Sequence, residues 1–231
     1  MTKEDTLKEM NLTPKSILKN SLSASFGLIL FGFGVYMVIQ ANIGAAPWDV
    51  FCIGLSNTLG IKYGNASIAI SVLIIITDII LGEKIGLGTV LDAILVGKTV
   101  DFLNWSNLIP AVQGKPGVSI ALALTGFVIE GFSQYFYMKS ALSCGPRDSF
   151  QIAIGKRLPR VKIGIVNIMI LTVVLVIGWI LGGPVGINSF IAPFGIGLAQ
   201  QLAFDTMKFD PKVVCHQNIL TSFKILFKGK H

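Results

Sequence analysis

Long apolar stretches dominate this chain of 231 residues and limit the environments in which it can fold. Several runs of about 18–20 residues contain no Lys or Arg, and about 20 apolar residues in a helix are enough to cross a hydrocarbon core of ~30 Å. Charged residues make up only 13% of the chain and the mean hydropathy is +0.72. A soluble globular chain carries about 25% charged residues. The sequence therefore predicts an all-α integral membrane protein.

The net charge of +7 is explained by membrane topology. Lys and Arg gather at the two ends of the chain and in one loop at residues 156–162, as the positive-inside rule expects of cytoplasmic segments. We therefore predict cytoplasmic N- and C-termini and no nucleic-acid partner. The three cysteines have no paired spacing and both histidines lie in the polar tail, so we predict no disulfide framework, no metal site and no cofactor.

The apolar runs form two halves around a linker rich in Pro and Gly. The predicted parts are a basic cytoplasmic lead, a first membrane repeat, the linker, a second membrane repeat and a basic cytoplasmic tail, at residues 1–21, 22–103, 104–118, 119–204 and 205–231. We predict six long transmembrane helices, at about residues 22–40, 66–81, 87–103, 119–138, 163–181 and 187–204. A short helix lies in each half, between the first and second long ones.

The two halves resemble each other as an internal duplication. At an offset of 99 residues the order of several Gly, Pro, Asp and Tyr residues recurs, with 8 identities in the 27 positions from 27 to 53. The pairs are Gly27/Gly126, Gly32/Gly131, Phe33/Phe132, Tyr36/Tyr135, Pro47/Pro146, Asp49/Asp148, Phe51/Phe150 and Ile53/Ile152. Four glycine pairs continue the match at an offset of 100, namely Gly64/Gly164, Gly82/Gly182, Gly86/Gly186 and Gly97/Gly197. Such a period is the mark of a repeat architecture.

Each short segment opens with a proline followed two residues later by an aspartate. Pro47 precedes Asp49, and Pro146 precedes Asp148. Proline suits the first position of a helix, where its missing N–H is not needed, and a carboxylate in the first turn opposes the helix macrodipole. Helices at residues 47–59 and 146–157 would measure about 20 and 18 Å, which is too short to span a bilayer comfortably.

These short helices have two interpretations. They can be amphipathic connectors at the membrane interface, with the aspartate as a cap. Alternatively, they are half or re-entrant helices at matching places in the two halves, which is the pattern that marks a transporter's substrate site. Their N-termini would then point at a bound group. Arg147 next to the second start favours an anion there, or serves as a cytoplasmic anchor.

The number of membrane crossings follows from these segments. If they do not cross, each half has three spans and the halves are inverted, with Lys62 and Lys115 outside. If they do cross, there are eight spans and the halves are parallel, with Lys84, Lys139 and Arg147 outside. The positive-inside rule does not decide between the two schemes, and segment length favours six full spans.

Ionisable residues within the apolar runs are candidates for function, because each is costly in lipid and usually faces a cavity or a partner. Glu130 lies in the middle of its run, with Gln134 one turn further on the same face. We take Glu130 as the first candidate for proton coupling and Asp92 as the second. Lys98 and Asp101 are three residues apart and are expected to pair with each other. The alternative for Glu130 is a protonated carboxyl hydrogen-bonded to a neighbouring helix.

Four stretches in order resemble the YczE/YyaS/YitT group of bacterial membrane proteins, closest to its YczE-like branch. They are APWDVF, GLGTVLDAILVGKTVDF, CGPRDSFQIAIGKR and WILGGPVGINSF, and the resemblance covers about residues 22–204. It implies a multi-pass protein of the bacterial cytoplasmic membrane with a suspected role in transport. Its motif positions here are Pro47, Asp49, Gly88, Thr89, Pro146, Arg147 and Asp148. The second half reads Gly-Ile-Asn-Ser at 186–189, where the first reads Gly-x-Gly-Thr, so no mirrored role is predicted there.

The function we expect is a small-molecule secondary transporter or permease. Its substrate would bind at the repeat interface near the paired short helices, through Pro47, Asp49, Glu130, Pro146, Arg147 and Asp148. The alternative is a membrane-embedded binding or regulatory subunit without its own transport cycle, docking a cytoplasmic partner through the basic cluster at 156–162. A homodimer is also compatible with the chain. An enzyme is not expected, because the apolar runs lack His and no hydrolase or metalloprotease motif occurs.

Overall fold

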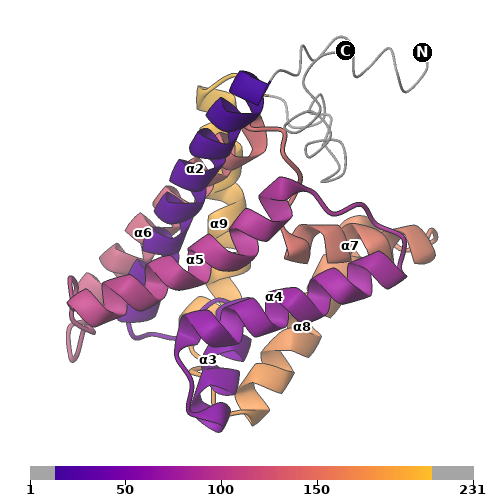
Figure 1. The fold of residues 1–231 in the computed structure, drawn as a ribbon. Helices are drawn as coiled ribbons and strands as arrows, with labels where there is room; N and C mark the ends of the chain where they lie inside the picture. The colour runs from indigo at the N-terminus through magenta and orange to yellow at the C-terminus, as the bar shows by residue number, and fades with distance from the viewer. Residues whose placement is uncertain (1–13, 210–231) are drawn as a thin grey trace, which may run out of the picture.

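The computed structural model describes residues 14–209, and this part of the chain consists of α-helices without any strand (Figure 1). The helices are α2 (Pro14–Gln40), α3 (Pro47–Leu59), α4 (Tyr63–Ile80), α5 (Leu87–Ser106), α6 (Pro116–Lys139), α7 (Pro146–Arg157), α8 (Ile163–Ile180) and α9 (Ile187–Thr206). The predicted all-α class is confirmed for the described residues. The short helices α3 and α7 have the predicted bounds, 13 and 12 residues long, with proline in their first turn.

Four helices, α2, α4, α6 and α8, are long and apolar enough to cross a membrane. The other long helices, α5 and α9, have 20 residues each but are more polar. Large apolar side chains are exposed on the outside, among them Ile80, Trp179 and Phe194, with 78%, 65% and 70% of their surface accessible. Such a surface is favourable in lipid and costly in water. The chain is a multi-pass membrane protein, and the count of six full spans stays a prediction.

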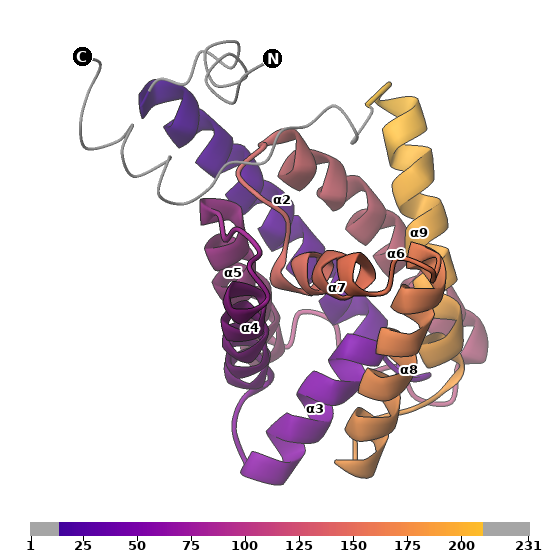
Figure 2. The same ribbon diagram turned by 90° about the vertical axis from the view of Figure 1, so that its right-hand side faces the viewer.

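Glycines set the packing around the long helices α2 and α6, which lie side by side in both views (Figures 1 and 2). A Cβ added to Gly34 on α2 would lie 2.9 Å from the carbonyl oxygen of Gly126 on α6. A Cβ on Gly126 would lie at the same distance from the Gly34 oxygen. The two backbones therefore approach as closely as small residues in membrane helices allow. Helix α5 packs on the other side of α2, and α9 packs on α6.

Further contacts join helices from different halves of the chain. Helix α3 packs against α8, as Figure 2 shows, and α4 packs against α7. The loop after α2 lies on the start of α9, where the Asn188 N–H donates to the Ile43 carbonyl at 3.0 Å. The loop after α6 lies on the start of α5, where the Gly88 N–H donates to the Leu142 carbonyl at 3.3 Å. Each half thus completes the backbone hydrogen bonding of the other.

The starts of α5 and α9 are built alike, although their sequences differ. The Gly86 N–H donates to Thr89 Oγ1 at 3.3 Å, and the Gly186 N–H donates to Ser189 Oγ at 3.1 Å. The sequence gives no reason to expect a mirrored role for the Gly-x-Gly-Thr motif. Serine nevertheless takes the place of threonine in this contact, because both present a hydroxyl at the same position.

Several helices extend beyond the predicted apolar runs. Helix α2 begins at Pro14, earlier than the apolar run at 22–40, because basic residues on its exposed side continue the helix beyond the apolar part. Helix α6 begins at Pro116, which we placed in the linker. Proline is favoured at a first helical position. The predicted lead and tail lie mostly outside the described residues.

Replacing Gly131 on α6 tests the close packing. A Cβ there would lie 2.5 Å from the carbonyl carbon of Ala199 on α9, and backbone atoms cannot give way as a side-chain tip can. We expect Gly131→Ala to lower the free energy of unfolding by about 1–3 kcal/mol, measured by SDS titration of micelle-bound protein. The matched control is Gly164→Ala on α8, whose added Cβ meets nothing within 4 Å. Equal stability of the two variants would contradict the close contact.

Candidate functional site

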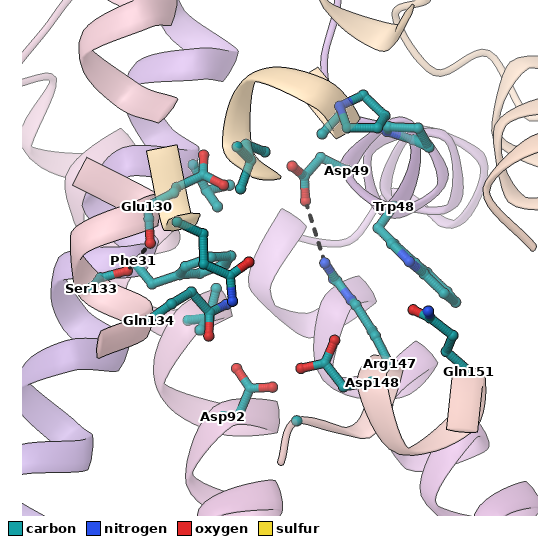
Figure 3. A pocket seen from close by; sticks show the side chains of 18 of the residues that line it. Phe31, Trp48, Asp49, Asp92, Glu130, Ser133, Gln134, Arg147, Asp148 and Gln151 are labelled. Carbon is teal, nitrogen blue, oxygen red and sulfur yellow. Dashed lines mark hydrogen bonds and ion pairs between the residues drawn. The ribbon is translucent and has the colours of Figure 1, made fainter. Parts of the chain in front are cut away.

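A cavity of about 340 Å³ lies between the helices, and each of the eight described helices contributes to its wall. The first turns of both short helices face it (Figure 3): Ala46 to Asp49 from α3, and Gly145, Arg147 and Asp148 from α7. The two halves of the chain therefore meet at one shared cavity. Its volume is at the small end of the range for ligand pockets, about 300–1,000 Å³.

Asp49 is buried at this cavity and does not cap its own helix. Only 4% of its surface is exposed, and α3 has no side-chain hydrogen bond at its N-terminus. The carboxylate accepts a hydrogen bond from the Tyr63 hydroxyl on α4 at 2.8 Å. It also lies 3.8 Å from the guanidinium of Arg147 on α7. Asp49 therefore joins three helices, which the interpretation as a simple cap does not predict.

Arg147 reaches from α7 across the cavity to α3 (Figure 3). Besides pairing with Asp49, its guanidinium stacks over the ring of Trp48 at 5.2 Å from the centroid. It also donates to Cys52 Sγ at 3.6 Å. A guanidinium held by a carboxylate and an aromatic face is well suited to a partly dry site. Arg147 thus links the starts of the two short helices.

Three further carboxyl groups line the cavity, from Asp92 on α5, Glu130 on α6 and Asp148 on α7. Among the residues described by the structure, none makes a hydrogen bond or a close ion pair to these three carboxylates. Glu130 sits where α2 and α6 touch, since a Cβ on Gly34 would lie 2.6 Å from Glu130 Cγ. Glycine at position 34 therefore makes room for the glutamate side chain.

Most of the predicted site residues come together at the cavity. Pro47, Asp49, Asp92, Glu130, Arg147 and Asp148 all line it. Pro146 is fully buried and does not line it. The expected pairing of Lys98 with Asp101 is wrong. Lys98 Nζ donates to Asn65 Oδ1, and Asp101 accepts from the Gly64 N–H, each at 2.8 Å.

Several lining residues are not among the predicted ones. Tyr137 follows Glu130 by seven residues on the same face of α6, a spacing that extends the pair of Glu130 and Gln134 by one more turn. Tyr137 could therefore have been predicted from this seven-residue spacing in the sequence. Trp48 adjoins the predicted positions, whereas Ser67, Asn167 and Gln200 come from α4, α8 and α9 and are brought to the cavity only by packing.

The fold and the site define a helical, multi-pass membrane protein with an internal charged cavity. Residues 18–203 match a family described as being of unknown function, DUF6198, and the chain belongs to this family. It is 32% identical to the uncharacterized membrane protein YczE of Bacillus subtilis (strain 168) over 174 residues, 74% of this chain and 79% of that protein. The resemblance to the YczE/YyaS group is thereby confirmed.

Two other relatives extend this group. An uncharacterized protein of Haemophilus influenzae (strain ATCC 51907 / DSM 11121 / KW20 / Rd) is 27% identical over 176 residues, 76% of this chain and 79% of its own. The uncharacterized protein YyaS of Bacillus subtilis (strain 168) is 25% identical over 169 residues, 71% of this chain and 82% of its own. No solved structure matches this chain.

A double-mutant cycle tests the link between the two short helices. We expect Arg147→Gln to lower the free energy of unfolding by about 1–3 kcal/mol, because it leaves the buried Asp49 without its cation. The variant carrying Asp49→Asn as well should lose less than the sum of the two single changes, with a coupling of about 0.5–3 kcal/mol. SDS titration measures all four proteins. Strictly additive losses would show that the 3.8 Å pair contributes no stability.

Proposed function

We propose that this protein is a small-molecule secondary transporter of the cytoplasmic membrane, with its substrate in the cavity between the two halves. One observation carries the proposal: both short helices, each of which begins with a proline, converge on one cavity that all eight described helices line. Paired short helices around a polar site are the arrangement expected where a transporter binds its substrate. In connectors at the membrane surface, Asp49 and Asp148 would not reach a shared cavity.

We also propose that the two halves are repeats related by a twofold axis. Several helix contacts support this, because they have a counterpart in the other half: α2 with α5 matches α6 with α9, and α3 with α8 matches α7 with α4. The contact between α4 and α5 is the exception, since α8 and α9 do not pack on each other in the same way. The crossed loop contacts at Ile43 and Leu142 are a matching pair as well. Two repeats that pack against each other around a shared cavity can tilt relative to one another. In secondary transporters built from repeats, such tilting opens the substrate site to each side of the membrane in turn.

In the proposed topology the short helices stay within the membrane and the halves are inverted, giving six full spans. The lengths of α3 and α7, 13 and 12 residues, support this scheme. Three spans in each half place residues 104–115 on the outside and residues 156–162 in the cytoplasm, together with both termini. An eight-span chain would place residues 104–115 in the cytoplasm instead.

Cysteine labelling of whole cells tests this topology. In a variant without the native cysteines, we expect Lys115→Cys to react with a membrane-impermeant maleimide added outside, because the proposed topology exposes that loop. Arg160→Cys is the matched control, since both schemes place it in the cytoplasm, and it should react only after the membrane is permeabilised. Protection of Lys115→Cys in intact cells would overturn the inverted arrangement.

Glu130 and Asp92 are the groups we propose to carry the coupling proton. A carboxylate in lipid is stable only when it faces a cavity or a partner, and both residues line the cavity. The position of Glu130 at the contact between α2 and α6 adds a reason, since movement of one half against the other would change the surroundings of its carboxyl. Protonation and movement would then be linked.

A transport assay tests this role. Proteoliposomes with an imposed pH gradient are incubated with a bacterial metabolite extract, and their contents are identified by mass spectrometry. We expect the wild-type protein to accumulate at least one compound above the level of protein-free liposomes. Glu130→Gln should lose accumulation driven by the gradient but keep exchange without a gradient, because the neutral amide cannot release a proton.

The control for this assay is Asp205→Asn, which makes a similar change on the exposed end of α9, where Asp205 accepts a hydrogen bond from Gln201. It should behave as the wild type does. The absence of any compound above the protein-free level would contradict transport. Gradient-driven accumulation by Glu130→Gln would contradict the proton role alone.

The regulatory-subunit alternative gains no support from the basic cluster. Lys156 pairs with Glu83 at 2.8 Å, and Arg157 donates to the Leu81 carbonyl at 2.8 Å. Both side chains therefore hold the end of α7 to the turn between α4 and α5, a contact within the protein itself. That the protein is not an enzyme also stays a prediction, as do a homodimer and a cytoplasmic partner.

A further inference from the structure

The cavity contains more acidic than basic groups. Its walls carry the carboxyls of Asp49, Asp92, Glu130 and Asp148, and Arg147 is the one basic side chain among the described residues that line it. Arg147 is engaged with Asp49, Trp48 and Cys52 of α3. Arg147 is also the positive charge that acts on Asp92, Glu130 and Asp148, so one arginine faces four carboxyls. In a membrane this imbalance calls for protons or for a positively charged ligand.

Two of these carboxyls converge on the start of α7. A Cβ added to Gly145 would lie 2.5 Å from Asp92 Oδ2 and 3.7 Å from Asp148 Oδ2. Figure 3 shows both side chains pointing toward the same part of the cavity. Because Gly145 has no side chain, space remains between the carboxylates of Asp92 and Asp148. A single small group can contact both carboxylates there.

The hydroxyl of Tyr137 is an independent sign of a ligand at this place. Only 4% of Tyr137 is exposed, and its hydroxyl has no hydrogen-bond partner in the described part of the chain. Tyr137 lines the cavity, and Asp92 and Asp148 are its leading electrostatic neighbours. A buried hydroxyl without a partner is unfavourable for the fold. A bound group with N–H donors would satisfy its oxygen.

An apolar wall adjoins the same corner. Leu28, Phe31 and Val96 line the cavity and belong to the cluster of apolar residues that packs around Tyr137. A ligand whose charged head contacts Asp92, Asp148 and Tyr137 would therefore place an apolar body against this wall. Ligand pockets commonly combine such a surface with a few fixed polar groups.

We infer that the substrate is a small organic monocation, a primary ammonium or guanidinium compound, whose head binds between Asp92, Asp148 and the Tyr137 hydroxyl. This rests on the proposed transport function and names its substrate class. A helix N-terminus offers an anion only about half a positive charge, which does not outweigh the surplus carboxylates. A metal ion is not favoured, because no cluster of three His, Cys, Asp or Glu ligands occurs among the described residues.

Calorimetric titration of the full chain in lipid nanodiscs tests this inference. The probes are phenethylammonium, its acidic analogue 3-phenylpropanoate, and potassium ion. We expect the ammonium compound to bind and the other two not to bind. A preference for the carboxylate or for potassium overturns the inference, and so does binding of none of the three.

Variants then locate the site. Asp92→Asn/Asp148→Asn should weaken phenethylammonium binding at least ~10-fold, since both carboxylates that face the cationic head are neutralised. Asp205→Asn on the exposed end of α9 is the control and should bind as the wild type does. Unchanged binding by the double variant overturns the assignment.

A second variant, Gly145→Ala, leaves every charge in place and fits the native backbone. Gly145 has φ −62° and ψ 159°, which alanine adopts without strain. In Gly145→Ala the methyl group must displace the Asp92 carboxylate, a side-chain tip that can rotate. We expect binding to weaken while the unfolding midpoint stays equal to that of Gly164→Ala, where the added Cβ meets nothing within 4 Å. Wild-type affinity in Gly145→Ala overturns the site.

The results of the titration and of the liposome assay distinguish failure of the cation site from failure of the transport function. Binding of phenethylammonium by a protein that moves no compound across liposomes would leave the cation site standing and remove the transport function. Accumulation of anionic compounds by a protein that binds no ammonium probe would do the reverse.

Discussion

The ion pair between Arg147 and Asp49 joins the starts of two helices that are each too short to cross a bilayer. Hydrocarbon offers no hydrogen bonds to a charged side chain, so such a group persists in a membrane only where the protein supplies a partner or a cavity. The other acidic residues of the cavity follow the same constraint. Around them, the outer surface remains apolar and suited to lipid.

Close backbone contacts make this arrangement possible. Gly34 and Gly126 bring α2 and α6 together at the level of Glu130. The loop after each of these helices meets the start of a long helix from the other half, through Gly88 in one case and Asn188 in the other. The halves are therefore interlocked, and the cavity belongs to neither half alone. A ligand bound there contacts both, which is the condition for coupling its binding to their relative movement.

Membership in a family of unknown function makes a physical description of the site useful beyond this chain. The relevant features are chemical: an arginine held by an aspartate and a tryptophan, a glycine that leaves room between two carboxylates, and a buried tyrosine hydroxyl without a partner. Relatives can be compared position by position for these features. A relative that lacks the Gly145 space or the Tyr137 hydroxyl would be expected to bind a different ligand.

The sequence by itself determined the membrane environment, the all-α class and the bounds of the two short helices. These depend on local properties, namely apolar length, proline at a helix start and charge in the first turn. It also identified most of the charged cavity residues, because an ionisable group in an apolar run is stable in lipid only beside a cavity or a partner. Only the tertiary structure decided that Asp49 binds Tyr63 and Arg147, and that Asp101 binds the backbone of Gly64. Those contacts join residues far apart in the chain, and helix packing brings them together without leaving a local pattern.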